Sequence, residues 1–111
     1  MATKEETEIQ KAIMLELSKY GIVIRQQSGN FYTEYGSRIK VGFTGLSDLQ
    51  FISDNGKLIV FMEVKTGRKG SKPSDEQINF INFINAKKSP NLKAGIVRNV
   101  QEALQLINKM I

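Results

Sequence analysis

The stretch from Gly45 to Lys65, GLSDLQFISDNGKLIVFMEVK, decides the fold of this chain. It contains two short segments of strand-forming residues, one on each side of an Asp-Asn-Gly turn at 54–56. Because Asn and Gly both tolerate positive φ, Asn-Gly between two such segments predicts a β-hairpin. The second segment, 58–64, is almost wholly apolar, which is typical of a strand buried on both faces. We therefore expect a hairpin whose second strand lies inside a sheet.

Three charged side chains are expected at the open end of this hairpin. Glu63 and Lys65 end the apolar strand, and side chains alternate along a strand, so both point to the same side. Asp48 lies across from them on the first strand. One interpretation is an ion pair that closes the sheet, since such pairs are common and usually contribute little. The other is a divalent-metal site, because carboxylate oxygens suit Mg²⁺ or Mn²⁺ and a nearby lysine can position or deprotonate an attacking water.

The composition limits the chemistry that is open to the chain. Its 111 residues include no cysteine and no histidine, which excludes disulfides, His-ligated zinc and Ser-His-Asp hydrolysis. Carboxylates, lysines, hydroxyls and amides must therefore carry any reaction. The length predicts one domain, spanning 1–111. The net charge of +5 favours a polyanionic partner, nucleic acid first, although plain solubility explains such a charge as well.

No feature of the sequence points to a membrane. The chain has no apolar run near the length of about 18 residues that marks a membrane-spanning helix. Its first residues lack the charged-then-apolar pattern of a signal peptide. We therefore expect a cytoplasmic protein without a membrane partner.

Apolar periodicity predicts three helices around the hairpin. The first covers 3–20 and ends at Gly21, and a strand starts at 22. Ser74 opens the second helix, and Ser74-x-x-Gln77 is a capping box, so Gln77 needs no further role on this ground. A strand at 93–98 and a helix from 99 onwards complete the chain. The order helix, strands, helix, strand, helix predicts a single α/β domain with a mixed sheet.

Two further segments combine cations with other features. The segment 31–41 predicts an irregular extended arm or a second hairpin, in which aromatic residues accompany Arg38 and Lys40. Such residues suit stacking on bases and contact with phosphates, but they also suit a cover over the sheet or a partner interface. The segment 66–73 predicts an exposed mobile loop. It is either a contact to the DNA backbone or a solvated linker, and its cations are Arg68, Lys69 and Lys72.

The motifs, taken in order, resemble a VRR-NUC (virus-type replication-repair nuclease) domain of the PD-(D/E)XK nuclease superfamily. The resemblance covers nearly the whole chain and rests on ETEIQ at 6–10, GLSD at 45–48, EVK at 63–65, SDEQ at 74–77 and the strand and helix over 94–111. The chain departs from the superfamily in one position, because Ser47 stands where a proline usually precedes the aspartate.

The resemblance implies a restriction-endonuclease-like domain, with a mixed sheet flanked by helices, that hydrolyses DNA phosphodiesters with Mg²⁺ or Mn²⁺. The metal ligands it implies are Glu8, Asp48, Glu63 and the backbone carbonyl of Val64, with Glu5 and Glu6 as substitutes for Glu8. Lys65 would orient or activate water, and Gln77 would reach the site, a role that it cannot easily combine with capping the helix. The expected DNA contacts are Arg38, Lys40, Ser47, Arg68, Lys69 and Lys72.

Stand-alone members of this family are phage-borne and look like Holliday-junction resolvases, which work as homodimers. The resemblance therefore implies branched DNA as the substrate, a homodimer, and a bacterial host cell as the place of action. Two other interpretations stay open. One is a catalytically silent DNA-binding module with salt-dependent affinity, and the other is a nuclease that acts on flaps, single strands or RNA.

Overall fold

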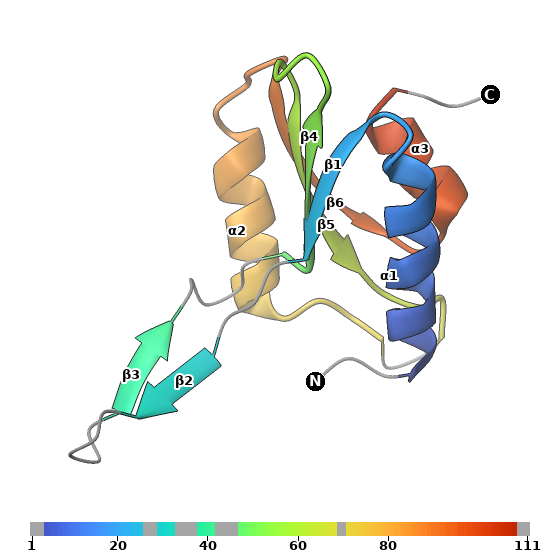
Figure 1. Ribbon diagram of the computed structural model, residues 1–111. Helices are drawn as coiled ribbons and strands as arrows, with labels where there is room; N and C mark the ends of the chain where they lie inside the picture. Colours follow the sequence, from blue (N-terminus) through green and yellow to red (C-terminus); the bar gives the residue numbers. More distant parts are fainter. Residues whose placement is uncertain (1–3, 26–28, 33–37, 42–46, 69–70, 109–111) are drawn as a thin grey trace.

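A computed structural model of the chain describes residues 4–25, 29–32, 38–41, 47–68 and 71–108 (Figure 1). In chain order the elements are α1 (Lys4–Leu17), β1 (Gly21–Arg25), β2 (Gly29–Tyr32), β3 (Arg38–Val41), β4 (Leu49–Ser53), β5 (Ile59–Val64), α2 (Asp75–Asn85), β6 (Leu92–Val97) and α3 (Val100–Leu106). The three helices and the positions of the strands agree with the order predicted from the sequence.

The central feature is a four-stranded sheet in the order β1-β4-β5-β6. In this sheet β1 is antiparallel to β4, and β4 is antiparallel to β5, whereas β5 and β6 are parallel. A parallel pair needs a crossover connection, and α2 supplies it between β5 and β6. The prediction of an α/β fold with a mixed sheet is therefore confirmed.

Helices cover both faces of the sheet, with α2 on one face and α1 and α3 on the other (Figure 1). The main core lies on the side of α1 and α3, where Val60, Met62 and Val64 of β5 pack with α1 residues such as Ile13. On the other face Phe61 meets Phe80 of α2 edge to face, with ring centroids 5.2 Å apart. The prediction that this strand is buried on both faces is confirmed.

The hairpin of β4 and β5 forms as predicted, but its turn differs from the expected geometry. The last pair of the ladder is Ile52 with Ile59, so the connection is wider than a two-residue Asn-Gly turn. Gly56 has a φ of 71°, whereas Asn55 is not among the described residues with positive φ. The side chain of Asn55 shapes the turn instead, because its Oδ1 accepts hydrogen bonds from the Lys57 N–H and the Ser53 hydroxyl.

The helix boundaries correct one prediction. We expected Gly21 to end the first helix, but α1 ends at Leu17 and Gly21 is the first residue of β1. A Cβ atom at Gly21 would lie 2.2 Å from the carbonyl oxygen of Ile52 on β4, so close strand pairing explains the glycine. None of the helices in the described ranges is both long enough and apolar enough to cross a membrane.

The strands β2 and β3 form a separate antiparallel pair, which stands apart from the main sheet in Figure 1. Of the two structures expected for this segment, the second hairpin is the one observed. The hairpin tip at 33–37 lies outside the described residues, as do the side chains of Arg38 and Lys40.

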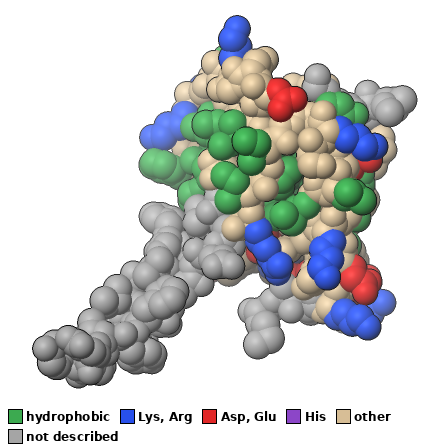
Figure 2. All heavy atoms as spheres, viewed as in Figure 1, with side chains coloured by type: hydrophobic (Ala, Val, Ile, Leu, Met, Phe, Trp, Pro, Cys, Tyr) green, Lys and Arg blue, Asp and Glu red, His purple; other side chains and the backbone are tan. Residues whose placement is uncertain are grey.

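Apolar side chains also reach the surface of the molecule. Ile22 and Ile24 of β1 are exposed, and so are Ile78 and Phe83 of α2. Figure 2 shows apolar side chains gathered in the middle of the viewed face, with lysines and arginines around them. The surface therefore offers apolar as well as cationic contacts.

Candidate functional site

Asp48 and Glu63 lie at the end of the sheet that is opposite the β4–β5 turn. Leu49 pairs with Met62 in the hairpin, so Asp48 and Glu63 are the next residues beyond this pair. The Asp48 Oδ2 atom accepts a 2.8 Å hydrogen bond from the backbone N–H of Val64. This bond holds the Asp48 carboxylate against the end of β5, next to Glu63.

Glu63 is only 1% exposed, and its two carboxylate oxygens have different surroundings. Oε1 accepts a 2.7 Å hydrogen bond from Nε2 of Gln77 and lies 3.7 Å from the ammonium of Lys65. Oε2 is buried and has no hydrogen-bond partner among the described residues. Because carboxylate oxygens only accept hydrogen bonds, a second carboxylate at Asp48 cannot satisfy it unless one of the two is protonated.

Burial and the neighbouring Asp48 carboxylate raise the pKa of Glu63 to about 8, although Lys65 acts in the opposite direction. Without a cation, Glu63 therefore keeps its proton at neutral pH. A cation bound by both side chains would remove the repulsion between them.

Lys65 lies on the same side of the strand as Glu63, as alternation predicts, and its side chain is 14% exposed. The ion pair of the simpler interpretation is thus present. It does not account for the whole pair of carboxylates, however, because it leaves Glu63 Oε2 unsatisfied. A structural ion pair therefore accounts for only one of the two carboxylate oxygens of Glu63.

Gln77 serves both roles that the sequence presents as alternatives. Its Oε1 accepts a hydrogen bond from the Ser74 N–H at 2.7 Å and completes the capping box of α2. Its Nε2 donates to Glu63. One amide therefore ties the start of α2 to the buried carboxylate.

The structure does not bring Glu8 together with the carboxylate pair. Glu8 is exposed on α1, and the described residues contain no cluster of three acidic side chains close enough to hold one ion. The links between α1 and the connection after β5 come from the two substitute positions instead. Glu5 pairs with Arg68 at 2.9 Å, and Glu6 accepts a 3.4 Å hydrogen bond from the Ser71 hydroxyl.

Hydrogen bonds link the described parts of the basic segment after β5. Thr66 is buried, its N–H donates to the Ser71 hydroxyl at 2.9 Å, and its own hydroxyl accepts from the Arg68 N–H. Arg68 and Lys72 are exposed, as the DNA-contact prediction requires. Lys69 lies outside the described residues.

Sequence reasoning missed two buried polar groups and misplaced one of them. Gln10 is 3% exposed, and the Ser47 hydroxyl is buried as well; neither Gln10 Oε1 nor Ser47 Oγ has a hydrogen-bond partner among the residues that the structure describes. Ser47 was expected to contact DNA, but the structure does not place its side chain at the surface. A signal for Gln10 is present in the sequence, because it lies three residues before Ile13 and seven before Leu17 on the apolar face of α1.

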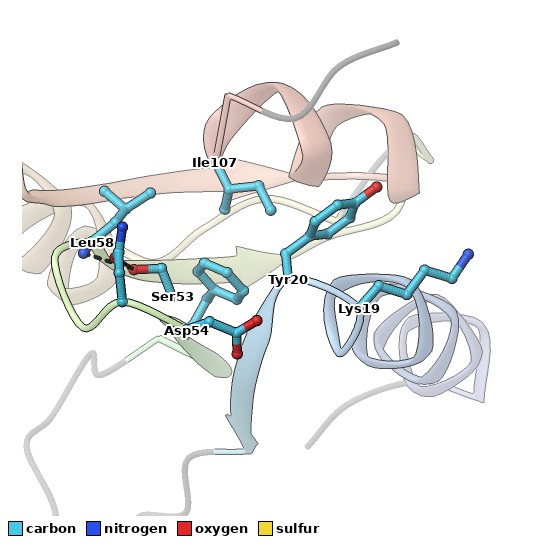
Figure 3. Close-up of a pocket in the computed structure, with 8 residues that line it drawn as sticks. Lys19, Tyr20, Ser53, Asp54, Leu58 and Ile107 are labelled. Atoms are coloured by element: carbon cyan, nitrogen blue, oxygen red, sulfur yellow. Dashed lines mark hydrogen bonds between the residues drawn. The ribbon is translucent and has the colours of Figure 1, made fainter.

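A hollow lies at the turn end of the hairpin (Figure 3). It has a volume of about 250 Å³ and is lined by Lys19, Tyr20, Phe51, Ser53, Asp54, Asn55, Leu58 and Ile107. Some polar groups of its rim are bonded to each other: the Leu58 N–H donates to the Ser53 hydroxyl at 3.0 Å, and the Ser53 hydroxyl donates to Asn55 Oδ1 at 2.7 Å. None of the buried unpaired atoms found in the described ranges belongs to its lining. The carboxylate pair is therefore the stronger candidate for a functional site.

Comparison with known proteins adds no relative, because no family model, curated protein or solved structure matches the chain. The functional argument therefore rests on the geometry of Asp48, Glu63, Lys65 and Gln77. The resemblance to the VRR-NUC family stays a prediction carried by the sequence motifs.

Proposed function

We propose that the chain is a Mg²⁺- or Mn²⁺-dependent phosphodiesterase of the VRR-NUC type that cuts DNA. The observation that carries this proposal is the pair of Asp48 and Glu63, in which one buried carboxylate oxygen has no donor among the described residues. Burying such a pair destabilises a fold unless a proton or a cation compensates it. A site of this kind at the end of two paired strands is better explained by a ligand than by stability.

The donor set fits a small divalent cation. Carboxylate and carbonyl oxygens are hard ligands, and Mg²⁺ uses only one or two protein carboxylates because it keeps several waters. Asp48 and Glu63 would hold the cation, together with the backbone carbonyl of Val64. Glu8 would join them only if its position changed, since it is exposed in this structure.

When bound, the cation supplies an activated water and neutralises charge on the phosphate. The residues around it have separate tasks. The Val64 N–H fixes Asp48, and Gln77 fixes Glu63, so the two carboxylates keep one arrangement. Lys65 places a positive charge beside Glu63, where it would offset the negative charge that builds up on the phosphate during attack.

DNA is the substrate that the charges favour. The net charge is +5, and Arg68 and Lys72 lie in the connection between β5 and α2, the elements that carry Glu63 and Gln77. Arg38 and Lys40 on β3 and Lys69 in the same connection are proposed as further backbone contacts. Branched DNA and a homodimer are the finer parts of this proposal and rest on the family resemblance.

The test is cleavage of labelled four-way junction, flap, duplex and single-stranded DNA with Mg²⁺, Mn²⁺ or EDTA. Wild-type protein should cut only with the metals. Asp48→Asn should reduce the rate by about 100-fold or more, the usual effect of removing one essential electrostatic group. Asp54→Asn is the matched control, because this exposed carboxylate at the hairpin turn should leave the rate unchanged.

The pattern of cuts separates the finer proposals. Paired symmetric cuts in the junction would support a homodimeric resolvase, whereas cuts in flaps, single strands or an RNA counterpart would keep the site and change the substrate. Binding without cutting under either metal would favour a catalytically silent DNA-binding module. Cleavage by Asp48→Asn at the wild-type rate would contradict the assignment of the site.

A further inference from the structure

Within the described part of the chain, α2 covers only one half of its face of the sheet. The helix packs against β5 and β6, and β6 is an edge strand. At the other edge, β1 directs Ile22 and Ile24 to the same face, because Ile24 pairs with Gln50 and Gln50 pairs with Phe61, which contacts α2. Ile22 is 63% exposed and Ile24 is 41% exposed. Neighbouring exposed apolar side chains, unlike scattered ones, indicate a contact surface.

Phe83 borders the same uncovered area from the side of α2. On one flank of the helix, the side chain of Asn85 bonds to the backbone of Ala94 in the edge strand β6. Phe83 precedes Asn85 by two positions, which is about 200° around the helix, so it lies on the flank that faces β4 and β1. Its residue is 59% exposed. We call Phe83, Ile22 and Ile24 the apolar patch.

The apolar patch shares its face of the sheet with the proposed cation site. Glu63 follows Phe61 by two positions, and Asp48 precedes Gln50 by two, so alternation places both carboxylates on the α2 side. The hydrogen bond from Gln77 of α2 to Glu63 agrees with this placement. Two residues of a strand span about 7 Å. The patch therefore begins within reach of a nucleotide whose phosphate lies at the carboxylates.

The chemistry of the apolar patch suits an unpaired base. The Lys87 ammonium lies 4.0 Å from the centroid of the Phe83 ring, so an aromatic ring and a cation stand together on this flank of α2. Unpaired bases stack on aromatic rings while nearby cations contact their phosphates. In a duplex the faces of the bases are stacked on each other and are not open to such a surface. The combination of apolar and cationic groups therefore favours unpaired nucleotides.

We propose that the apolar patch binds an unpaired base of the DNA, next to the phosphate that is cut. Phe83 stacks on this base, Ile22 and Ile24 contact it from the sheet, and Lys87 lies beside its phosphate. This inference rests on the proposed function. It narrows the substrate class to DNA with unpaired nucleotides, such as a flap, an open branch point or a single strand.

The experiment measures how tightly the protein binds a labelled single strand and a blunt duplex of the same sequence, by fluorescence anisotropy in EDTA, where no cleavage is expected. Phe83→Ala should weaken single-strand binding by about ten-fold or more, as is usual when a stacking side chain is removed, and should leave duplex binding nearly unchanged. Phe83→Tyr keeps a ring and should retain the wild-type preference. Ile24→Thr, which stays β-branched, should reduce the preference for the single strand less strongly than Phe83→Ala.

Two further variants serve as controls. Ile78→Ala is matched to Phe83→Ala, because Ile78 is an exposed apolar residue of the same helix. It lies seven positions before Asn85 and therefore on the opposite flank, towards β6. Ile78→Ala should bind both DNAs like the wild type. Lys72→Ala, which removes a proposed phosphate contact, should weaken binding of the two DNAs by similar factors.

The outcomes separate the inference from the proposed function. If Phe83→Ala lost no affinity, or lost it equally for single strand and duplex, the inference would be overturned and the proposed function would stand. Sedimentation of the wild type as a dimer and of Phe83→Ala as a monomer would assign the patch to a contact between two copies and would also overturn the inference. Wild-type protein that binds neither DNA would overturn both.

Discussion

The proton on Glu63 is the most informative feature at the scale of a single residue. Burial and Asp48 raise the pKa of Glu63 to about 8 from 4.5, so the folded chain holds this proton where the unfolded chain has lost it. The group that makes the site suited to a cation is therefore also one that weakens the fold as it ionises. Stability and function are in conflict at this position, as is common in active sites.

This conflict predicts how stability depends on pH. Between pH 4.5 and about 8 the folded state binds more protons than the unfolded state, so the free energy of unfolding in EDTA should fall as the pH rises. Urea unfolding at a series of pH values measures this slope. Glu63→Gln should have a shallower slope, because glutamine does not titrate. Equal slopes for the two proteins would contradict the assigned origin of the effect.

Saturating Mg²⁺ should remove that pH dependence. The cation binds the deprotonated carboxyl group, so its affinity rises as protons leave Glu63, and ligand binding to the folded state adds to stability. The free energy of unfolding of the wild type should then change little between pH 4.5 and about 8, whereas Glu63→Gln should respond little to the cation.

At the residue scale, part of the site could be predicted from the sequence. Alternation along the strand places Glu63 and Lys65 on one side, and they do form an ion pair. The burial of Gln10 Oε1 and Ser47 Oγ without partners among the described residues could not be predicted, because a polar residue among apolar ones carries no sign of which atom lacks a partner. That information depends on packing between α1 and the sheet, which local patterns do not specify.

At the scale of elements, Gln77 couples the start of α2 to the site. Its Oε1 caps the helix and its Nε2 holds Glu63, so the position of the carboxylate depends on where α2 begins. Helix α2 is also the crossover between β5 and β6. The same element therefore closes the sheet and orients a proposed ligand of the cation.

Two variants separate the cap from the site. Ser74→Ala removes the hydroxyl that accepts from the Gln77 N–H, and it should lower the free energy of unfolding by about 1 kcal/mol while the cleavage rate of folded protein stays near wild type. Gln77→Glu keeps an acceptor for the cap but replaces the donor to Glu63 with a carboxylate. It should slow cleavage with a much smaller loss of cap stability. The free energy of unfolding and the cleavage rate are measured for both variants. Equal effects of the two variants on both quantities would contradict the separation of the cap from the site.

The elements themselves were largely predictable, whereas their ends were not. Hydrophobic periodicity and the Asn-Gly signal predict α1, the β4–β5 hairpin and the crossover helix. The prediction of the turn was wrong in detail, because the Asn55 side chain shapes the turn and not a positive φ at this residue. We assigned Gly21 to the end of a helix, but a glycine required by close strand pairing looks the same in the local sequence. Only the contact with Ile52 distinguishes these two positions.

At the scale of the whole molecule, the sheet places the two carboxylates at one end and the hollow of Figure 3 at the other. The order of elements was enough to predict the α/β class and the mixed sheet. The pairing of β2 and β3 in their own sheet was left open, because the sequence of this segment suits an irregular extended arm as well as a second hairpin. Whether this hairpin serves DNA binding is a matter for the cleavage assay.

The central claim is that Asp48 and Glu63 form a divalent-cation site, and its most direct test is calorimetric titration with Mn²⁺ at pH 7 in buffers that differ in ionisation enthalpy. Because Glu63 has a pKa of about 8, wild-type binding should release up to about one proton per cation, and Asp54→Asn should behave in the same way. Glu63→Gln should bind weakly and release no proton. Wild-type protein that binds no Mn²⁺, or that binds it without proton release and as tightly as Glu63→Gln, would contradict the claim.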